Sequence, residues 1–207
     1  MIRKAILIGG TLVILLSFSC KKEELKHYYV SDAFKRWTVF NKGSYWIYKN
    51  DSTSVTDSTF VKENPKFLEI PPYSSQDNFT LEYIDMSYTS LFFATTRVRL
   101  NQGGGETFFM QVGNNEISAL IASTSDNFIP YFENINENIT YQLLSSDSVF
   151  YLGPQKFINV VSTMYTKNDK KWTCWFAKDV GLIKITATNT NPGFSWSLIK
   201  YRIAKLS

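Results

Sequence analysis

Two cysteines and one histidine are the side chains with the greatest capacity for nucleophilic or metal chemistry: Cys20, Cys174 and His27. A cysteine nucleophile needs a neighbouring base or cation that lowers its pKa. Cys174 alternates in phase with Trp172 and Phe176, as residues on one face of a strand do, so we predict that it is a small buried hydrophobic residue. The single histidine largely excludes His-rich zinc sites, H-E-x-x-H metalloproteases and most Ser-His-Asp triads.

Three further patterns could hold a ligand, and each has a simpler interpretation. The run Gly103-Gly104-Gly105 lacks the Lys-Ser/Thr of a phosphate-binding loop and precedes an expected strand, which favours a flexible hairpin tip. Residues 126–138 are rich in Asp, Asn and Glu, which offer the oxygen ligands of calcium, but they lack the D-x-[DN]-x-[DN]-G spacing. The 18 acidic side chains contain no pair that the sequence singles out for glycoside hydrolysis. We therefore predict no catalytic, metal-binding or cofactor-binding residue.

The N-terminus has the layout of a secretory signal. Arg3 and Lys4 precede an uncharged, mostly apolar run over residues 5–16, and the short segment 17–19 follows it. A helix of that length spans about 18 Å, which is less than the roughly 30 Å of a bilayer's hydrocarbon core. We predict that residues 1–19 are a signal peptide that is removed rather than retained as a membrane span.

The end of this signal, Leu16-Ser17-Phe18-Ser19-Cys20, resembles a relaxed bacterial lipobox. The resemblance implies that Cys20 is acylated, becomes the first residue of the mature chain and attaches the protein to a membrane. Each buried methylene group contributes about 0.8 kcal/mol, so several acyl chains together make detachment negligible. The alternative is an ordinary signal peptide that carries a cysteine near its end by chance.

The next four residues, Lys21-Lys22-Glu23-Glu24, resemble the lysine-plus-acidic signals that carry lipoproteins to the cell surface in some Gram-negative lineages. The resemblance implies a lipid-anchored protein of the outer membrane that faces outward, and the periplasmic face of that membrane is the alternative. A charged run also keeps a linker extended. We predict a lipidated tether over residues 20–36, in which Ser31 and Asp32 cap one helical turn that runs to Arg36.

The remaining residues, 37–207, have the composition of one globular domain. The chain is 44% apolar, 19% charged and 16% aromatic. Removal of Arg3 and Lys4 with the signal reduces the net charge of +4 to only +2, so nucleic acid is a poor partner. The middle of the chain is acidic and its C-terminal part is basic. Either the basic strands form a face for lipid headgroups or sugars, or they neighbour the acidic strands and the charges interleave.

The pattern along this domain predicts an all-β fold. Short apolar or alternating runs are separated by turn residues such as Pro71-Pro72, Gly153-Pro154 and Asn191-Pro192-Gly193. We expect an antiparallel sheet, as an open or half barrel or a sandwich, that ends in a four-strand meander. The predicted strands are 44–49, 56–62, 67–70, 78–87, 90–100, 107–112, 116–122, 140–144, 148–152, 157–166, 171–178, 182–188 and 194–204.

Two short stretches, 40–48 and 175–184, resemble landmarks of small β-rich bacterial outer-membrane lipoproteins. The first contains G-x-x-W-x-Y and the second V-G-L-I-K. The resemblance implies an open or half-barrel β body and carries over no activity. In physical terms, Gly43 fits a bend at the start of a strand, and Gly181 fits a turn position with positive φ.

Three function classes follow from these expectations. We favour a noncatalytic binding, accessory or scaffold module whose partner is an envelope protein, a glycan or a lipid. A carrier of a lipid or other hydrophobic ligand is the alternative, and it needs an empty apolar cavity inside the half barrel. A hydrolase is the third class, and it needs a cleft with two or more carboxyl groups of displaced pKa. The inner face of the sheet distinguishes the three.

Overall fold

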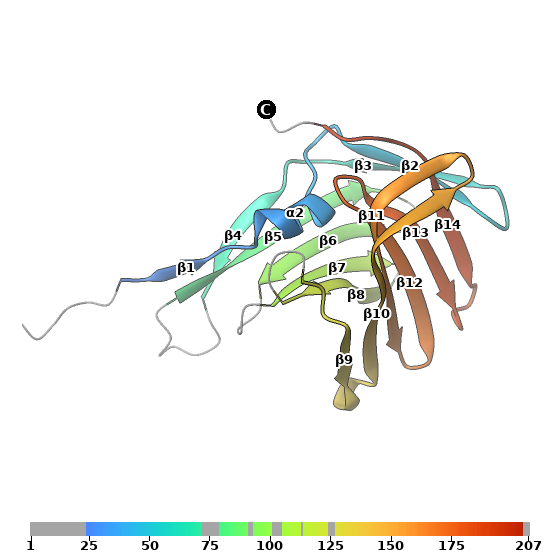
Figure 1. The fold of residues 1–207 in the computed structure, drawn as a ribbon. Helices are drawn as coiled ribbons and strands as arrows, with labels where there is room; N and C mark the ends of the chain where they lie inside the picture. Colours follow the sequence, from blue (N-terminus) through green and yellow to red (C-terminus); the bar gives the residue numbers. More distant parts are fainter. Residues whose placement is uncertain are drawn as a thin grey trace, which may run out of the picture.

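The computed structural model describes residues 24–71, 79–90, 93–100, 105–112, 114–123 and 127–204 (Figure 1). The predicted signal peptide, Cys20 and the first two glycines of the run 103–105 lie outside these residues. The described part forms a sheet of 14 strands and one α-helix. All strand pairs in it are antiparallel except β1 with β5, which confirms the predicted all-β, open antiparallel sheet.

The elements follow one another as short strands with a single early helix. The helix is α2 (Asp32–Thr38), and η1 (Ile135–Glu137) is a 3₁₀ turn. The strands are β1 (Lys26–Tyr28), β2 (Tyr45–Asn50), β3 (Thr56–Val61), β4 (Lys66–Ile70), β5 (Phe79–Thr89), β6 (Phe93–Leu100), β7 (Glu106–Val112), β8 (Asn115–Ala122), β9 (Tyr131–Asn134), β10 (Ile139–Leu152), β11 (Gln155–Lys167), β12 (Lys170–Ala177), β13 (Gly181–Thr188) and β14 (Phe194–Arg202).

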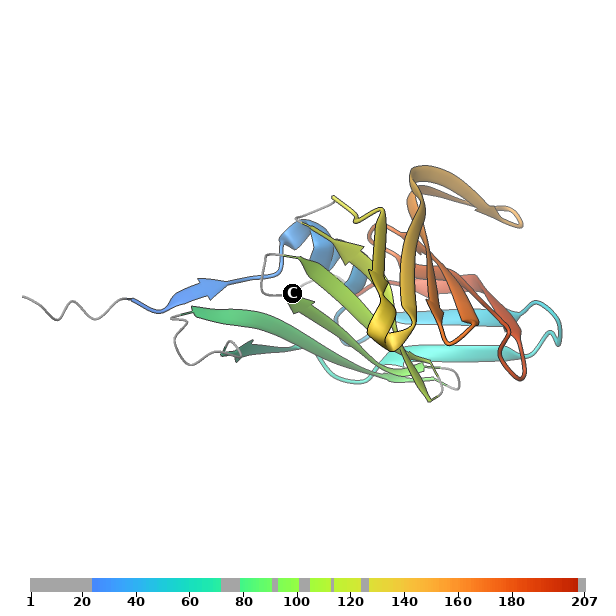
Figure 2. The ribbon, with the colours of Figure 1, turned by 90° about the horizontal axis from the view of Figure 1, so that it is seen from below.

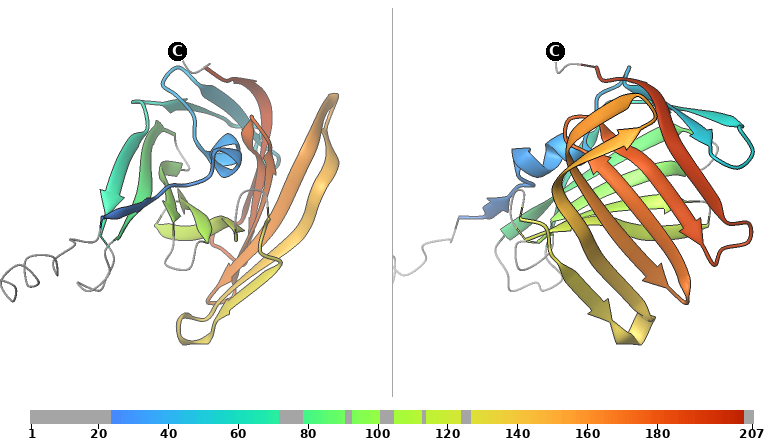
Figure 3. Two further views of the ribbon diagram at one scale, coloured as in Figure 1. Left: turned by 60° about the vertical axis from the view of Figure 1, so that its left-hand side comes forward. Right: turned by 45° about the vertical axis from the view of Figure 1, so that its right-hand side comes forward.

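The strands lie side by side in the order β8-β7-β6-β5-β3-β2-β14-β13-β12-β11-β10-β9, and β1 and β4 pair with β5 outside this path. The sheet curls into a trough around α2 without closing into a barrel (Figure 3). Its two halves approach where the Thr163 hydroxyl of β11 donates a hydrogen bond to the Ala119 carbonyl of β8 (2.6 Å). The predicted C-terminal meander is confirmed as β11–β14, each strand pairing with the next.

Strand alternation explains which side chains fill the trough. Trp172, Cys174 and Phe176 on β12 are each 1% exposed, as their shared phase predicted. Ile183 and Ile185 on β13 are fully buried, whereas Lys184 between them is only half-buried. Because large flat and branched side chains pack well on a pleated surface, these strands place one continuous apolar layer on the concave side.

The predicted strands 140–144 and 148–152 are one strand, β10. Register shifts between Leu143 and Ser145, and again around Ser148, let the strand continue through its polar middle. The Ser145 and Ser162 hydroxyls lie 2.7 Å apart across the ladder, and Asp147 takes a positive φ of 50°. A bulged strand therefore replaces the expected turn. Two short strands that the sequence pattern did not predict, β1 and β9, complete the sheet.

The segment predicted as a tether, 20–36, belongs to the folded domain from β1 onward. Val30 and Phe34 are 2% and 0% exposed, and Trp37 is 1% exposed. The predicted helical turn is confirmed: Ser31 is the N-cap residue, its hydroxyl accepts a hydrogen bond from the Phe34 amide, and the helix continues to Thr38. Phe34 and Trp37, three residues apart, lie on the side of this short helix that faces the trough, and Val30 is buried just before its N-cap. The tether therefore ends before β1.

Gly181 begins β13 at a position where a side chain has no room. Its φ is +89°, and an added Cβ would lie 2.8 Å from a ring carbon of Phe40. Gly181→Ala should lower the free energy of unfolding by about 2–4 kcal/mol, because it adds both backbone strain and a clash in the core. Gly153→Ala is the matched control, since Gly153 also has a positive φ (+55°) but nothing within 4 Å of an added Cβ. Equal losses in urea denaturation of the two variants would refute the role of Phe40.

Candidate functional site

The inner face of the trough is filled by the protein's own side chains. The void that remains among Trp37, Tyr48, Phe108 and their neighbours measures about 20 Å³. That is close to the volume of one water molecule, whereas pockets for small organic ligands measure about 300–1,000 Å³. This void is therefore too small for a lipid or another large hydrophobic ligand.

An open groove of about 670 Å³ lies at the mouth of the trough. It is lined by residues of α2, of the strand β4, of the turn between β12 and β13 and of the chain that follows β14. The residues that line it are Asp32, Lys35, Arg36, Val39, Phe40, Asn41, Phe67, Asp179, Ile203 and Ala204. The size of the groove falls within the range of known ligand sites.

The groove combines apolar surface with charge. Phe40 is 8% exposed and closes the groove toward the core, whereas Phe67 on β4 is 56% exposed. The Lys35 ammonium lies 5.6 Å from the centre of the Phe67 ring, which is within the range of a cation–π contact. The same ammonium lies 3.0 Å from the Glu82 carboxylate, so its charge is balanced from the side of the sheet.

An ion pair forms one wall of the groove. The Arg36 guanidinium donates from Nε to the Asp179 carboxylate (2.6 Å) and from Nη2 to its other oxygen. The Asp179 amide in turn donates to the Arg36 carbonyl (2.9 Å). The hydrogen bonds from Arg36 lower the pKa of the Asp179 carboxyl group. Asp179 lies in the turn between β12 and β13, where its φ is left-handed (63°). Its ion pair with Arg36 therefore connects that turn to α2.

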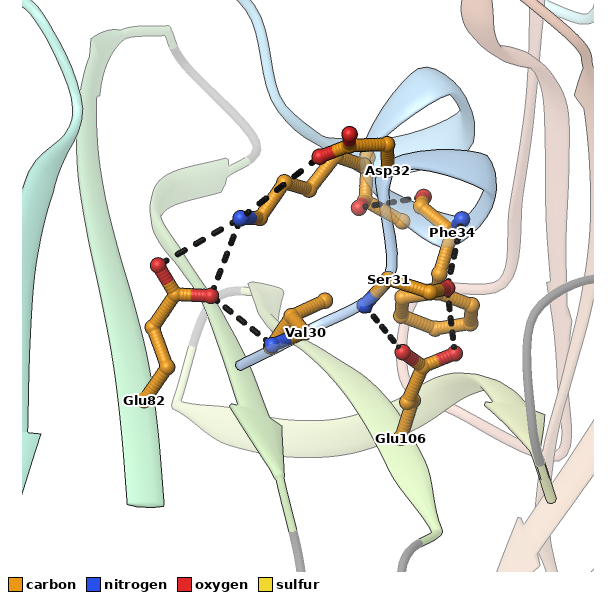
Figure 4. A network of polar contacts seen from close by, with 8 residues as sticks. Val30, Ser31, Asp32, Phe34, Glu82 and Glu106 are labelled. Carbon is orange, nitrogen blue, oxygen red and sulfur yellow. Dashed lines mark hydrogen bonds and ion pairs between the residues drawn. The ribbon is translucent and has the colours of Figure 1, made fainter. Parts of the chain in front are cut away.

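Two buried carboxylates hold the N-terminal segment on the inner face of the sheet (Figure 4). Glu82 on β5 is 6% exposed and accepts a hydrogen bond from the Val30 amide (2.8 Å). Glu106 on β7 is 2% exposed and accepts from the Ser31 amide (2.5 Å) and the Ser31 hydroxyl (3.1 Å). Hydrogen bonds to ionised acceptors are about twice as strong as neutral ones. The two glutamates therefore fasten the start of α2 rather than face a substrate.

No sequence motif identified these glutamates, although the alternation of buried and exposed positions along their strands contained a signal. Glu82 is in phase with the buried residues Ile84 and Met86 on β5, and Glu106 is in phase with Phe108 on β7. A carboxylate in phase with a buried face needs a partner, because an unpaired buried charge is very costly. That partner is the backbone of residues 30 and 31, which no local pattern identifies.

Glu106→Gln should lower the free energy of unfolding by about 1–3 kcal/mol, because an amide cannot accept from both Ser31 donors as the carboxylate does. Urea denaturation measures the loss, and amide exchange should increase first in α2. Glu116→Gln is the control, since Glu116 forms an exposed pair with Arg97 (3.1 Å) whose loss costs about 1 kcal/mol or less. A loss for Glu106→Gln no larger than the control's would contradict the fastening role.

The other residues that the sequence singled out do not come together in the structure. Burial strongly raises the pKa of the Cys174 thiol, which makes it a poor nucleophile. Nδ1 of His27 lies 2.9 Å from both the Glu69 carboxylate and the Thr80 hydroxyl on the exposed β1–β5–β4 surface. In the described part of the stretch 126–138, the Tyr131 hydroxyl donates to Glu133 (2.9 Å).

Among the described residues, no group of three or more His, Cys, Asp or Glu side chains could hold a metal ion. In the same ranges, no helix has the length and apolar character needed to cross a membrane. Comparison of the chain with family models, with curated proteins and with solved structures found no match.

Proposed function

We propose that this protein is a lipid-anchored binding module of the bacterial outer membrane, attached through acylated Cys20, that binds an envelope partner noncatalytically in the groove beside α2. The choice of site rests on the difference in volume between the interior void and the groove. The interior void measures about 20 Å³ and the groove about 670 Å³. A partner can therefore enter the groove without displacing the core.

Binding is favoured over hydrolysis by the state of the carboxylates. A glycoside hydrolase pairs an acid of raised pKa with a second, ionised carboxylate. In the groove, Arg36 holds the pKa of Asp179 below its ordinary value, so this group stays ionised. The buried pair Glu82 and Glu106 is occupied by the backbone of Val30 and Ser31. These carboxylates support positioning and recognition rather than proton transfer.

The carrier alternative depends on an empty interior, and the trough offers little room for a ligand. Trp37 and Phe34 from α2 are buried against the sheet where a carried ligand would have to lie. An acyl chain would have to displace this helix and break its hydrogen bonds to the two glutamates. We therefore favour a partner that enters the groove from outside.

The groove favours a partner with both apolar and polar groups. Phe67 offers an exposed ring, and the Arg36–Asp179 pair offers charged donors and an acceptor beside it. A protein segment or a glycan of the envelope carries both kinds of group. Because the ion pair balances the local charge, strong attraction of a highly charged polymer is not expected at this site.

Photo-crosslinking in intact cells tests the groove. Replacement of Phe67 by a benzophenone-bearing phenylalanine places a reactive aromatic group in the groove at an exposed position. Tyr151, which is 63% exposed on the β10–β11 hairpin, is the matched control. The proposal predicts a discrete crosslinked species from position 67 and none of the same mass from position 151. Normal expression of both variants with no product specific to position 67 would overturn it.

Protease treatment of intact cells tests the direction in which the protein faces. The resemblance of Lys21-Lys22-Glu23-Glu24 to surface-export signals leads us to expect that the protein is digested without permeabilisation. A periplasmic marker protein must survive the same treatment. Protection until the outer membrane is opened would place the protein on the periplasmic face instead.

A further inference from the structure

The outer face of β1, β4 and β5 carries apolar side chains in register. Leu81 on β5 pairs with Tyr28 on one side and with Ile70 on the other, and Leu68 pairs with Tyr83. Tyr28, Leu68 and Ile70 are 48%, 49% and 41% exposed. We call these five residues the outer patch. Their neighbours in the chain, such as Phe67, point to the opposite face and toward the groove.

This composition is unusual for the solvent side of an antiparallel sheet, which is ordinarily polar. Where β13 pairs with β14, the outer face follows the ordinary pattern, with Lys184, Thr186, Ser195 and Ser197. A hollow of about 140 Å³ borders the outer patch, and Ile70, Leu81 and Tyr83 line it together with the buried residues Glu82 and Leu100. Exposed apolar patches of this kind mark interaction surfaces.

The patch lies at the end of the molecule where the chain enters the domain (Figure 1). Tyr28 is itself part of the patch, and only six residues lead from Cys20 to Lys26. A chain of that length reaches at most about 20 Å when fully extended. An acyl group on Cys20 would therefore keep this end of the sheet, and with it the outer patch, within about 20 Å of the lipid surface.

Basic residues flank the patch. Lys26 pairs with Phe79 at one end, and Arg99 pairs with Tyr83 beside it. Arg97 is engaged with Asp85 and Glu116. Tyrosine and basic side chains around an apolar centre suit the headgroup region of a bilayer, where rings are half immersed and cations meet phosphate.

We propose that the outer patch docks on the bilayer to which Cys20 anchors the chain, so that the sheet lies with this face on the lipid and the groove opens away from it. This inference rests on the proposed lipid anchor. The anchor supplies attachment, and the patch supplies orientation. Because α2 and Phe67 lie on the opposite face of the same strands, docking leaves the groove accessible to a partner.

The test uses the acylated mature protein, purified in detergent and reconstituted into vesicles of phosphatidylethanolamine and phosphatidylglycerol. A polarity-sensitive fluorophore is attached to Leu68→Cys or, as the control, to Ile158→Cys, where Ile158 is 60% exposed. Ile158 belongs to the β10–β11 hairpin, which lies at the opposite end of the molecule from β1 (Figure 2). Cys174 is buried and does not compete for the label. Lipids with a nitroxide on the acyl chain should quench the Leu68 probe about threefold or more above the Ile158 probe. Equal quenching of the two probes would overturn the docking.

A second variant separates docking from anchoring. With the probe on Tyr28→Cys, the additional changes Leu68→Glu and Ile70→Glu should abolish the excess quenching while the protein still floats with the vesicles. Both positions are exposed, and an unchanged urea midpoint confirms the fold. Persistent quenching in this variant would contradict docking through the patch. Failure of the unsubstituted protein to float would instead refute the lipid anchor, and with it the proposed function.

Discussion

Trp37→Ala is expected to lower the free energy of unfolding by about 3–5 kcal/mol. The indole is 1% exposed, meets Phe128 edge to face with ring centres 5.3 Å apart, and lies 5.8 Å from the Lys178 ammonium. Its removal leaves a cavity beside the existing void, which the surrounding strands cannot fill without moving. Urea denaturation followed by tryptophan fluorescence and far-ultraviolet circular dichroism measures the change.

Tyr151→Ala is the control for this prediction. Tyr151 is a large aromatic residue that is 63% exposed, so its loss should change the free energy of unfolding by about 0.5 kcal/mol or less. If Trp37→Ala cost no more than the control, α2 would not be part of the cooperative core. The segment around it would then behave as the tether that the sequence suggested.

Raising the pH from 9 to 11 should remove several kcal/mol of stability. Tyr48, Tyr88 and Tyr141 are almost fully buried, and burial raises the pKa of all three, that of Tyr88 to about 12. In the unfolded chain a tyrosine titrates near pH 10. Above that pH the unfolded state binds fewer protons than the folded state, so stability that is complete below pH 10 is lost as the pH rises toward 12. Each such tyrosine contributes a slope of about 1.4 kcal/mol per pH unit.

Tyr88→Phe tests the source of this slope. The substitution keeps the ring, and it removes a hydroxyl that titrates only in the unfolded state over this range. Urea midpoints at pH 8, 9.5 and 11 should therefore fall less steeply in the variant, by about 1.4 kcal/mol per pH unit above pH 10. Parallel curves for the two proteins, or a wild-type protein equally stable at pH 8 and 11, would refute the assignment.

The parts of the fold that the sequence predicted well are those that local alternation determines. Phe176 and Ile185 are buried with their in-phase neighbours, and the short turns between their strands allow only an antiparallel meander. Gly181 has the positive φ that its turn position predicted, and Gly43 lies just before β2, where a bend was predicted. In each case the decisive interaction lies within a few residues of the chain.

The parts that the sequence did not predict depend on distant contacts. β1 has three residues and exists because β5 offers an edge for it. β10 passes through its polar middle because β11 stays paired with it across the bulges. The ion pair between Lys184 and Asp51 (3.5 Å) likewise joins the basic and acidic parts of the chain. This contact agrees with the arrangement in which basic and acidic strands are neighbours and their charges interleave. No local pattern specifies these pairings.

The candidate site depends on contacts between distant segments even more than the fold does. Arg36 and Asp179 are 143 residues apart, and Phe67 comes from a third segment. The local sequence around each of them is that of an ordinary surface or strand residue. The curl of the sheet brings them together, and that curl follows from the twist and bulges of many strands. The proposed membrane attachment at Cys20 has the opposite character, since its prediction rests on five adjacent residues and does not depend on the fold.

Mass spectrometry of the N-terminal peptide from membrane-extracted protein tests the central claim most directly. The account predicts that residues 1–19 are absent and that the mature chain begins at Cys20 with fatty acyl chains attached. The variant Cys20→Ala should lose this modified peptide and the protein's attachment to the outer membrane. An unmodified Cys20, or a mature chain that begins elsewhere, would contradict the account.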